Sequence, residues 1–237
     1  MGQFAGAALV AIVRAVHEED AFANLLLPRS IERAGLSTAD AALATELTYG
    51  TLRRQGYYDA VIALAASRPV DQIDSPILDA LRLGAHQLLS TRVASHAAVN
   101  ESVGLARTVG GQSTTGFVNA VLRTISRDTP ESWLERVLEG ARSDDERLSL
   151  EHSHPVWIVR AFRRALAAEG RADELIELLA ADNLAPTVTM IALPGLAEAP
   201  EEERAVRLVL PRVPQRRHDR RRPGPARPLA SERAERV

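Results

Sequence analysis

The spacing of apolar residues is the feature that most constrains the fold of this chain. Between residues 4 and 140, apolar side chains recur every three or four positions, which is typical of one face of an α-helix. In the clearest case, the apolar residues that follow Ile77 stand at i+1, i+4, i+8, i+11 and i+12, ending at Leu89. No part of this range alternates between apolar and polar residues as a half-buried strand does. The sequence therefore predicts an all-α bundle.

Capping residues and glycines predict where the helices begin and end. Ser37 with Asp40 three residues later favours a helix start, and Ser75 as cap with Pro76 after it favours another. Gly35 and Gly56 are expected to end the helices that precede them. The expected helices cover about residues 4–17, 22–34, 37–55, 57–67, 75–89, 97–109, the stretch around 117–125, and 129–138.

The pattern changes after residue 140. A capping box at Ser143 opens a helix, Pro155 begins a second, and residues 172–181 form a third, so residues 141–185 are expected to be a helical linker. Residues 187–193 (TVTMIAL) form the first β-like segment, and one isolated strand is not a stable unit. We interpret residues 186–210 as the start of a truncated subdomain.

Composition excludes several classes of function. The chain has 237 residues and no cysteine, which excludes disulfides, thiolate zinc sites and cysteine nucleophiles. All 29 basic residues are arginine, as expected from a GC-rich genome. No apolar run is long enough to span a bilayer and no signal peptide is evident, so we expect a cytoplasmic protein without a membrane partner.

Charge is distributed unevenly. Residues 211–237 hold 9 arginines against 3 acidic residues, a local charge of +6, whereas the other 210 residues hold 20 arginines against 28 acidic residues, a charge of −8. This tail has no periodicity and is expected to be disordered. Three interpretations stay open: a basic RNA-binding tail, a solvated tail without a role, and out-of-frame translation of GC-rich DNA.

In the octet 116–123 (GFVNAVLR), a single amide, Asn119, interrupts the apolar face of a helix. A buried amide without a partner costs roughly 1–3 kcal/mol, so we expect Asn119 to bond to a neighbouring backbone group. The octet resembles the corresponding segment of NusB-like RNA-binding domains, particularly the domain that precedes bacterial rRNA cytosine methyltransferases.

Further segments resemble the same family in the same order. They are 40–53 (DAALATELTYGTLR), the pair Tyr58-Asp59, 81–89 (LRLGAHQLL) and 96–100 (HAAVN). The resemblance covers residues 5–140, and it implies a NusB-like RNA-binding helical domain at residues 1–140. Residues 152–157 (HSHPVW) and 181–183 (ADN) resemble the linker of the RsmB-type small-subunit rRNA (cytosine carbon-5) methyltransferases.

The resemblance implies a chemistry that this chain lacks the residues to perform. In that family a cysteine thiolate adds to carbon 6 of cytosine, and a glycine-rich turn holds S-adenosylmethionine. This chain has neither a cysteine nor a G-x-G sequence. We therefore expect no cofactor in this chain and no methyl transfer by it alone, with the catalytic domain lost by truncation or frameshift.

The candidate RNA contacts are polar residues at helix ends or on helix faces. Arginines near a helix C-terminus also offset its dipole, and a polar strip on the expected 75–89 helix also suits a solvated face. His152 and His154 lack a third ligand in pattern, so no metal site is expected. Glu46, in an apolar helix, is expected to form a buried ion pair with an arginine. The RNA-binding candidates are Arg14, Arg53, Arg54, Arg82, His86, Gln87 and Arg123.

Three functions are consistent with these observations. The first is rRNA binding by the recognition region of an rRNA methyltransferase, a role in rRNA processing, with a missing catalytic domain as its partner. The second is a stand-alone NusB-type antitermination factor that regulates transcription with a transcription-complex protein. The third is a helical protein–protein interaction module, which the acidity of residues 1–210 favours.

Overall fold

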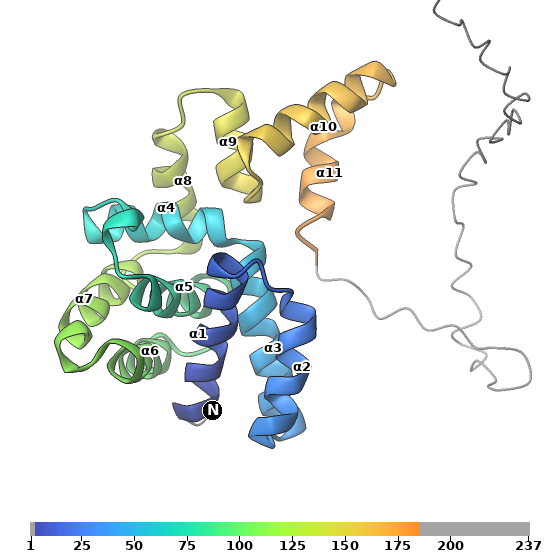
Figure 1. Cartoon of the computed structure of the whole chain (residues 1–237). Coiled ribbons are helices and arrows are strands. Elements are labelled where there is room, and N and C mark those ends of the chain that lie inside the picture. Colours follow the sequence, from blue (N-terminus) through green and yellow to red (C-terminus); the bar gives the residue numbers. More distant parts are fainter. Residues whose placement is uncertain (1–2, 185–237) are drawn as a thin grey trace, which may run out of the picture. The chain divides into compact units, whose positions relative to one another are not determined.

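The computed structural model describes residues 3–184, and every regular element in this range is helical (Figure 1). The α-helices are α1 (Gln3–Glu18), α2 (Ala23–Ala34), α3 (Thr38–Arg53), α4 (Gln55–Ala66), α5 (Ser75–Ser90), α6 (Ser95–Gly110), α7 (Thr115–Ile125), α8 (Pro130–Glu139), α9 (Asp144–His152), α10 (Val156–Ala168) and α11 (Leu175–Ala181). Short 3₁₀ turns are η1 (Val70–Gln72), η2 (Gln112–Thr114) and η3 (Ala172–Glu174). The predicted all-α class is confirmed.

The chain divides into two units, Met1–Pro186 and Thr187–Val237. The strand predicted at residues 187–193 and the tail predicted at residues 211–237 lie outside the described residues. Within the part of the chain that the structure describes, no helix is both long and apolar enough to cross a membrane.

Side-chain caps fix several helix starts as the sequence predicts. The Ser37 hydroxyl accepts a hydrogen bond from the backbone N–H of Asp40 at 3.2 Å. The Ser143 hydroxyl accepts one from the N–H of Glu146 at the start of α9, also at 3.2 Å. Each cap satisfies an N–H that the first helical turn leaves without an intrahelical partner.

Two predicted boundaries are wrong. Ser75 lies inside α5 rather than capping it, because Asp74 occupies the cap position and the Ser75 hydroxyl donates to Glu18 on α1 at 2.7 Å. Gly56 does not end a helix; α3 ends at Arg53, and Gly56 belongs to α4. This earlier break turns the chain so that Tyr57 and Tyr58 are buried in the core.

Helix α5 forms the centre of the bundle. Every residue from 77 to 86 is buried, and α5 packs against α1, α3, α4, α6 and α7. A Cβ at Gly84 would lie only 2.8 Å from Leu122 on α7 and 2.9 Å from the Ser102 hydroxyl on α6. This close approach is possible only without a side chain, so Gly84 seats both α6 and α7 on α5.

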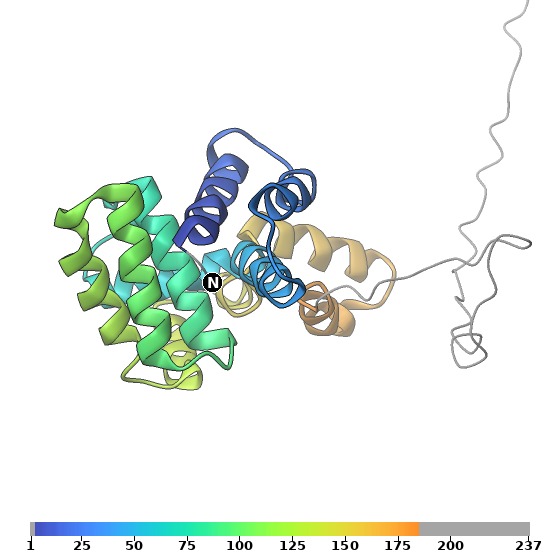
Figure 2. The ribbon, with the colours of Figure 1, turned by 90° about the horizontal axis from the view of Figure 1, so that it is seen from below.

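Helices α6 and α7 lie side by side at one edge of the bundle and are joined through η2 (Figure 2). Helix α8 is anchored to the end of α7, because the buried indole N–H of Trp133 donates to the carbonyl of Ile125 at 2.9 Å. The direction of α7 is therefore fixed at its C-terminal end, where Arg123 lies.

The last three helices have a small core of their own. Val159 and Leu166 of α10 pack with Leu175 and Leu179 of α11, and this cluster is separate from the large core of the bundle. Helix α9 joins the two, since it packs against α4 and α8 as well as α10.

Candidate nucleic-acid interface

Three of the predicted RNA contacts lie near helix ends, but they differ in exposure and in the groups that they contact. Arg14 is exposed on α1, and its guanidinium is 3.8 Å from the carboxylate of Glu18 one turn later. Arg53 and Arg54 are half-buried where α3 meets α4, and the Arg54 guanidinium lies over the ring of Tyr57 at 4.8 Å. A cation over an aromatic face is attracted by the negative face of the ring. Of the three, only Arg14 is exposed, and a carboxylate already lies beside its guanidinium.

Arg82 does not lie on a solvated or RNA-facing strip, as the sequence suggested. Its guanidinium is buried and donates to both oxygens of Asp59, at 2.6 and 2.8 Å, and to Asp79 at 2.8 Å. Burial lowers the pKa of Arg82, but the two carboxylates more than offset this, and the net pKa is raised. His17 also contacts Asp79, at 3.3 Å. Through these side-chain contacts, α1, α4 and α5 are connected to one another in the interior of the bundle.

His86, the second residue of that expected strip, is also buried. The Tyr58 hydroxyl contacts its Nδ1 at 2.8 Å, and Glu46 lies 3.5 Å from its Nε2. Burial lowers the pKa of His86 to about 4, so the imidazole is neutral at neutral pH and the contact with Glu46 is not an ion pair. The buried Glu46–arginine pair expected from the sequence is wrong, because the Glu46 side chain is 53% exposed.

Gln87, the third residue of the strip, is half-buried and bonds within its own helix. Its side-chain amide donates to the carbonyl of Leu83 at 3.2 Å. Gln87 also lines the apolar pocket described below, so the three residues of the expected strip have three different environments.

The structure brings two of the sequence motifs together at the edge formed by α6 and α7. A pocket of about 270 Å³ lies between these helices. Its lining residues are Ser95, His96, Val99, Asn100 and Val103 from α6, and Asn119, Arg123 and Ser126 from α7 and its end. The HAAVN and GFVNAVLR segments thus form the two walls of one pocket. The sequence flagged Arg123 for this role, but it gave no signal that Asn100 lies opposite.

Asn119 has a different partner from the one that the sequence suggested. Its Oδ1 accepts a hydrogen bond from Nε of Arg123, one turn later, at 3.0 Å, rather than bonding to backbone. Asn119 is half-buried, whereas Arg123 is exposed at the mouth of the pocket. The start of α6 lies at the same pocket, and its cap residue Ala94 provides no side-chain acceptor for the first N–H groups. Both features favour an anionic or acceptor-rich ligand.

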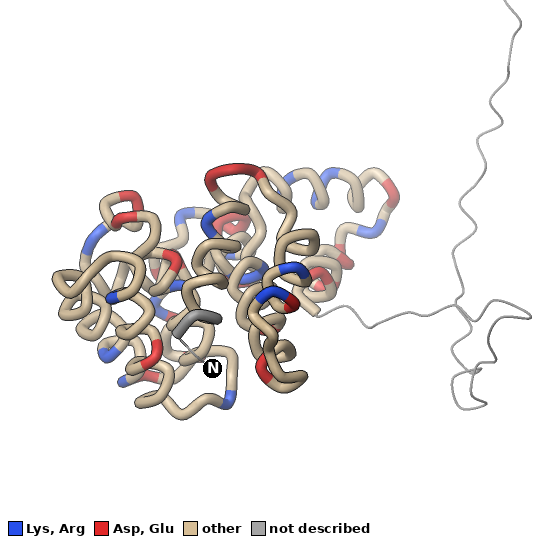
Figure 3. The backbone as a smooth tube through the Cα atoms, turned by 60° about the horizontal axis from the view of Figure 1, so that its bottom comes forward, with Lys and Arg blue, Asp and Glu red and all other residues tan. Residues whose placement is uncertain are grey.

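The charge of this edge is opposite in sign to the net charge of residues 1–184. Residues 1–184 hold 24 acidic residues against 18 arginines, a net charge of −6. Residues 91–127 hold four arginines against one acidic residue, Glu101, a net charge of +3. The four are exposed: Arg92, Arg107, Arg123 and Arg127. Figure 3 marks the arginines of the described residues in blue along the backbone. Among residues 3–184, no carboxylate lies within 4.0 Å of any of these guanidinium groups.

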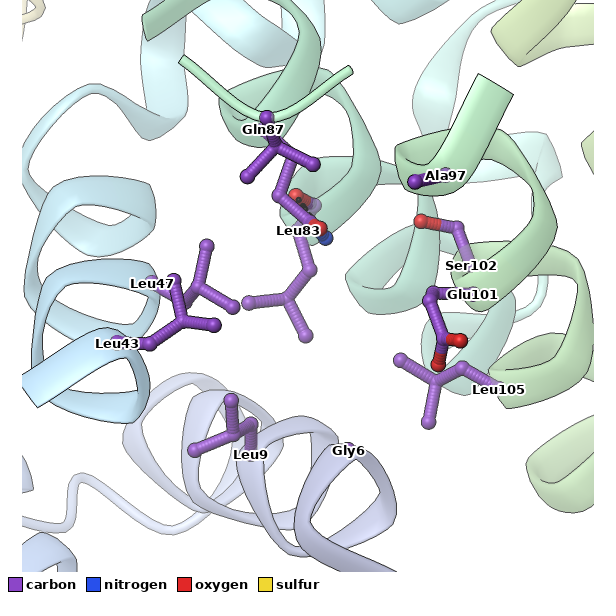
Figure 4. A pocket seen from close by; sticks show the side chains of 11 residues that line it. Gly6, Leu9, Leu43, Leu47, Leu83, Gln87, Ala97, Glu101, Ser102 and Leu105 are labelled. Carbon is purple, nitrogen blue, oxygen red and sulfur yellow. Dashed lines mark hydrogen bonds between the residues drawn. The ribbon is translucent and has the colours of Figure 1, made fainter. Parts of the chain in front are cut away.

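A second pocket has the opposite chemistry. It has a volume of about 290 Å³ and is lined by leucines from α1, α3, α5 and α6, with Leu9 on one side and Leu83 on another (Figure 4). Its one charged lining residue is Glu101, and the buried Ser102 hydroxyl there has no hydrogen-bond partner. A mainly apolar lining with a carboxylate does not suit a polyanion, so this pocket is not the nucleic-acid site.

The imidazole of His154 contacts two other residues. Its Nδ1–H donates to the His152 carbonyl at 2.7 Å, and its Nε2 lies 3.5 Å from Asp182. Among residues 3–184, no group of three histidine, aspartate or glutamate side chains is arranged to hold a metal ion.

Comparison with known proteins agrees with this geometry. The model of the NusB family matches residues 5–127, which include α3, α5, α6 and α7. The chain belongs to the NusB family. Both walls of the α6–α7 pocket lie within the matched residues.

Similar proteins include methyltransferases. The chain is 46% identical over 196 residues to a putative methyltransferase of Mycobacterium tuberculosis, covering 82% of this chain and 42% of the relative. It is 31% identical over 163 residues to a probable ribosomal RNA small subunit methyltransferase B of Bacillus subtilis, covering 68% and 35%. It is 27% identical over 194 residues to the ribosomal RNA small subunit methyltransferase B of Pseudomonas syringae, covering 74% and 42%. The chain spans less than half the length of these curated relatives.

Proposed function

We propose that this chain binds RNA of the small ribosomal subunit through the edge formed by α6 and α7. The observation that carries the proposal is the meeting of two family motifs at a polar pocket, within a basic stretch of an otherwise acidic helical domain. Affinity for a nucleic acid depends on cations that replace its counterions, and the four exposed arginines of residues 91–127 can do so. We take the kind of RNA from the names of two relatives, which are called ribosomal RNA small subunit methyltransferases.

The proposed role is recognition without chemistry. The chain has no cysteine to add to a pyrimidine and no G-x-G turn to hold S-adenosylmethionine. We therefore expect that the protein neither binds this cofactor nor transfers a methyl group to small-subunit rRNA. Equilibrium dialysis with labelled cofactor, and methyl incorporation into the same rRNA, measure the two expectations separately.

The test of RNA binding uses paired charge reversals in the full chain. Arg123→Glu with Arg127→Glu alters the proposed interface, and Arg29→Glu with Arg33→Glu alters two exposed arginines of α2 by the same charge. Fluorescence anisotropy with a labelled small-subunit rRNA fragment is recorded over a range of salt concentrations. We expect the first pair to lower the slope of log K against log salt by about 1.4–1.8, since each lost phosphate contact removes about 0.7–0.9.

The control pair decides the outcome. If Arg29→Glu with Arg33→Glu weakens binding as strongly as the interface pair, the affinity comes from overall charge and the proposed interface is wrong. If the unaltered protein shows no salt-sensitive binding near physiological ionic strength, RNA binding itself is wrong.

A second function has a separate observation in its favour. The apolar pocket beside Leu83 and Glu101, together with the excess of acidic residues, suits a basic amphipathic segment of a protein partner. Loss of RNA binding in the test above, together with retention of the fold, would leave a helical protein–protein interaction module as the better account.

A further inference from the structure

We infer that the pocket between α6 and α7 recognises an unpaired guanine in single-stranded RNA. This inference rests on the proposed RNA-binding function, and it names what that site reads beyond the phosphate backbone. It depends on the orientation of one guanidinium, on the free donors around it and on the size of the pocket.

Asn119 orients the guanidinium of Arg123. The Nε–H of Arg123 is occupied by the Asn119 carbonyl oxygen at 3.0 Å, so the side chain is held along α7 rather than free to rotate. The two Nη groups have no hydrogen-bond partner among residues 3–184, and their N–H groups form the planar fork of a guanidinium. A fork that is held in advance loses less side-chain freedom on binding than a free arginine does.

The remaining polar groups of the pocket also favour acceptors on the ligand. Asn119 uses its oxygen for Arg123, which leaves its NH₂ group to donate into the pocket. Asn100, on the opposite wall, makes no hydrogen bond to residues 3–184 and offers a second amide. A ligand edge with two adjacent acceptors fits the Arg123 fork.

The apolar part of the lining and the volume fit a flat ring. Val99 and Val103 form an apolar surface on the α6 side, and the pocket holds about 270 Å³. A base that remains in an RNA duplex presents its major-groove edge in a deep, narrow groove that side chains cannot reach. A pocket of this kind is accessible to a base that is turned out of a loop or a single strand.

Among the bases, guanine matches the donors best. Its O6 and N7 are adjacent acceptors, which arginine contacts with two N–H groups, whereas adenine presents a donor at N6 beside N7. A phosphate group also presents two acceptor oxygens to the same fork. The two sources therefore share one chemistry at Arg123, and only a change of base at constant charge distinguishes them.

The experiment compares short single-stranded oligouridines that carry one central guanine, adenine, 7-deazaguanine or inosine. All four have equal charge, so phosphate contacts are held constant. We expect roughly 5- to 100-fold weaker binding when guanine is replaced by adenine or 7-deazaguanine, because the two-acceptor edge is lost. Inosine keeps O6 and N7, and it should bind as guanine does.

Matched variants identify the residues responsible. Arg123→Lys keeps the charge but removes the fork, so the preference for guanine should fall while the salt slope is unchanged. Asn119→Ala should reduce the preference as well, because Arg123 loses its orienting partner. Arg127→Lys, an exposed arginine outside the pocket lining, is the control and should leave the preference intact.

The outcomes separate the two claims. Equal affinity for the guanine and adenine oligonucleotides, with binding that still depends on Arg123, would mean that the pocket holds a phosphate and that the inference is wrong while RNA binding stands. A guanine preference that survives Arg123→Lys would also overturn it. Absence of binding to every oligonucleotide and to the rRNA fragment overturns both.

Discussion

Replacement of Arg82 by methionine tests whether this side chain supports the fold rather than binding RNA. Arg82 makes three hydrogen bonds to carboxylates, two of them to Asp59 and one to Asp79. Asp59 is 21% exposed and can regain water, whereas Asp79 is fully buried and one of its oxygens already lacks a partner. Breaking a buried pair by removing one partner costs about 3–5 kcal/mol, and here Asp79 carries most of that cost.

The assay is urea unfolding followed by helical circular dichroism, with the free energy of unfolding compared between variants. We expect Arg82→Met to lose about 3 kcal/mol. The double variant Arg82→Met with Asp79→Asn should regain about half of this, since it removes the uncompensated buried charge. RNA affinity of the folded fraction should not change in either variant.

A loss below about 1 kcal/mol would refute this account, because that is the range of exposed ion pairs. No recovery in the double variant would mean that lost packing of the arginine stem, rather than the charge of Asp79, causes the destabilisation. Asp59→Asn is the control; the partial exposure of Asp59 predicts a smaller loss than that of Arg82→Met.

Three further changes have defined outcomes. The pKa of His86 in the folded protein is about 4, below its ordinary 6.5, so its contribution to stability is complete above pH 6.5 and is lost as the pH falls toward 4. His86→Asn should therefore remove about 3 kcal/mol of the pH dependence of the free energy of unfolding in urea. A pH profile that is unchanged in this variant would contradict the lowered pKa of His86. Gly50→Ala places a Cβ against Cε1 of the His86 ring and should cost about 1–3 kcal/mol. A raised Tm would show that the ring can move. Trp133→Phe leaves the Ile125 carbonyl without its donor and should lower the free energy of unfolding by about 1–3 kcal/mol. The same urea assay measures this loss, and Trp157→Phe, which alters an exposed ring, is the control.

The sequence predicts the helices well where local chemistry decides them. Ser37 and Ser143 cap their helices because a hydroxyl and an N–H three residues later are neighbours in any such turn. The sequence-based prediction is wrong for Arg82 and His86, because polar residues on the helix face opposite a row of leucines have the pattern of a solvent-exposed face. Their partners Asp59 and Tyr58 are 23 and 28 residues away, and only the packed bundle places them together.

The candidate site could be predicted only in part for the same reason. The octet indicates Asn119 and Arg123, and their spacing of four residues allows the bond between them. Asn100 belongs to another motif, and no local pattern places it across a pocket from Asn119. That proximity follows from Gly84, which lets two helices settle closely on α5.

Because the described chain has two separate hydrophobic cores, we expect two different free energies of opening for its helices. Helix α5 contacts five other helices, so its amides exchange with solvent only when most of the bundle comes apart. The α10–α11 pair is held by four buried side chains, Val159, Leu166, Leu175 and Leu179. We therefore expect its amides to exchange through a smaller, local opening that leaves the α6–α7 edge folded, so α10 and α11 can reorient while that edge keeps its shape.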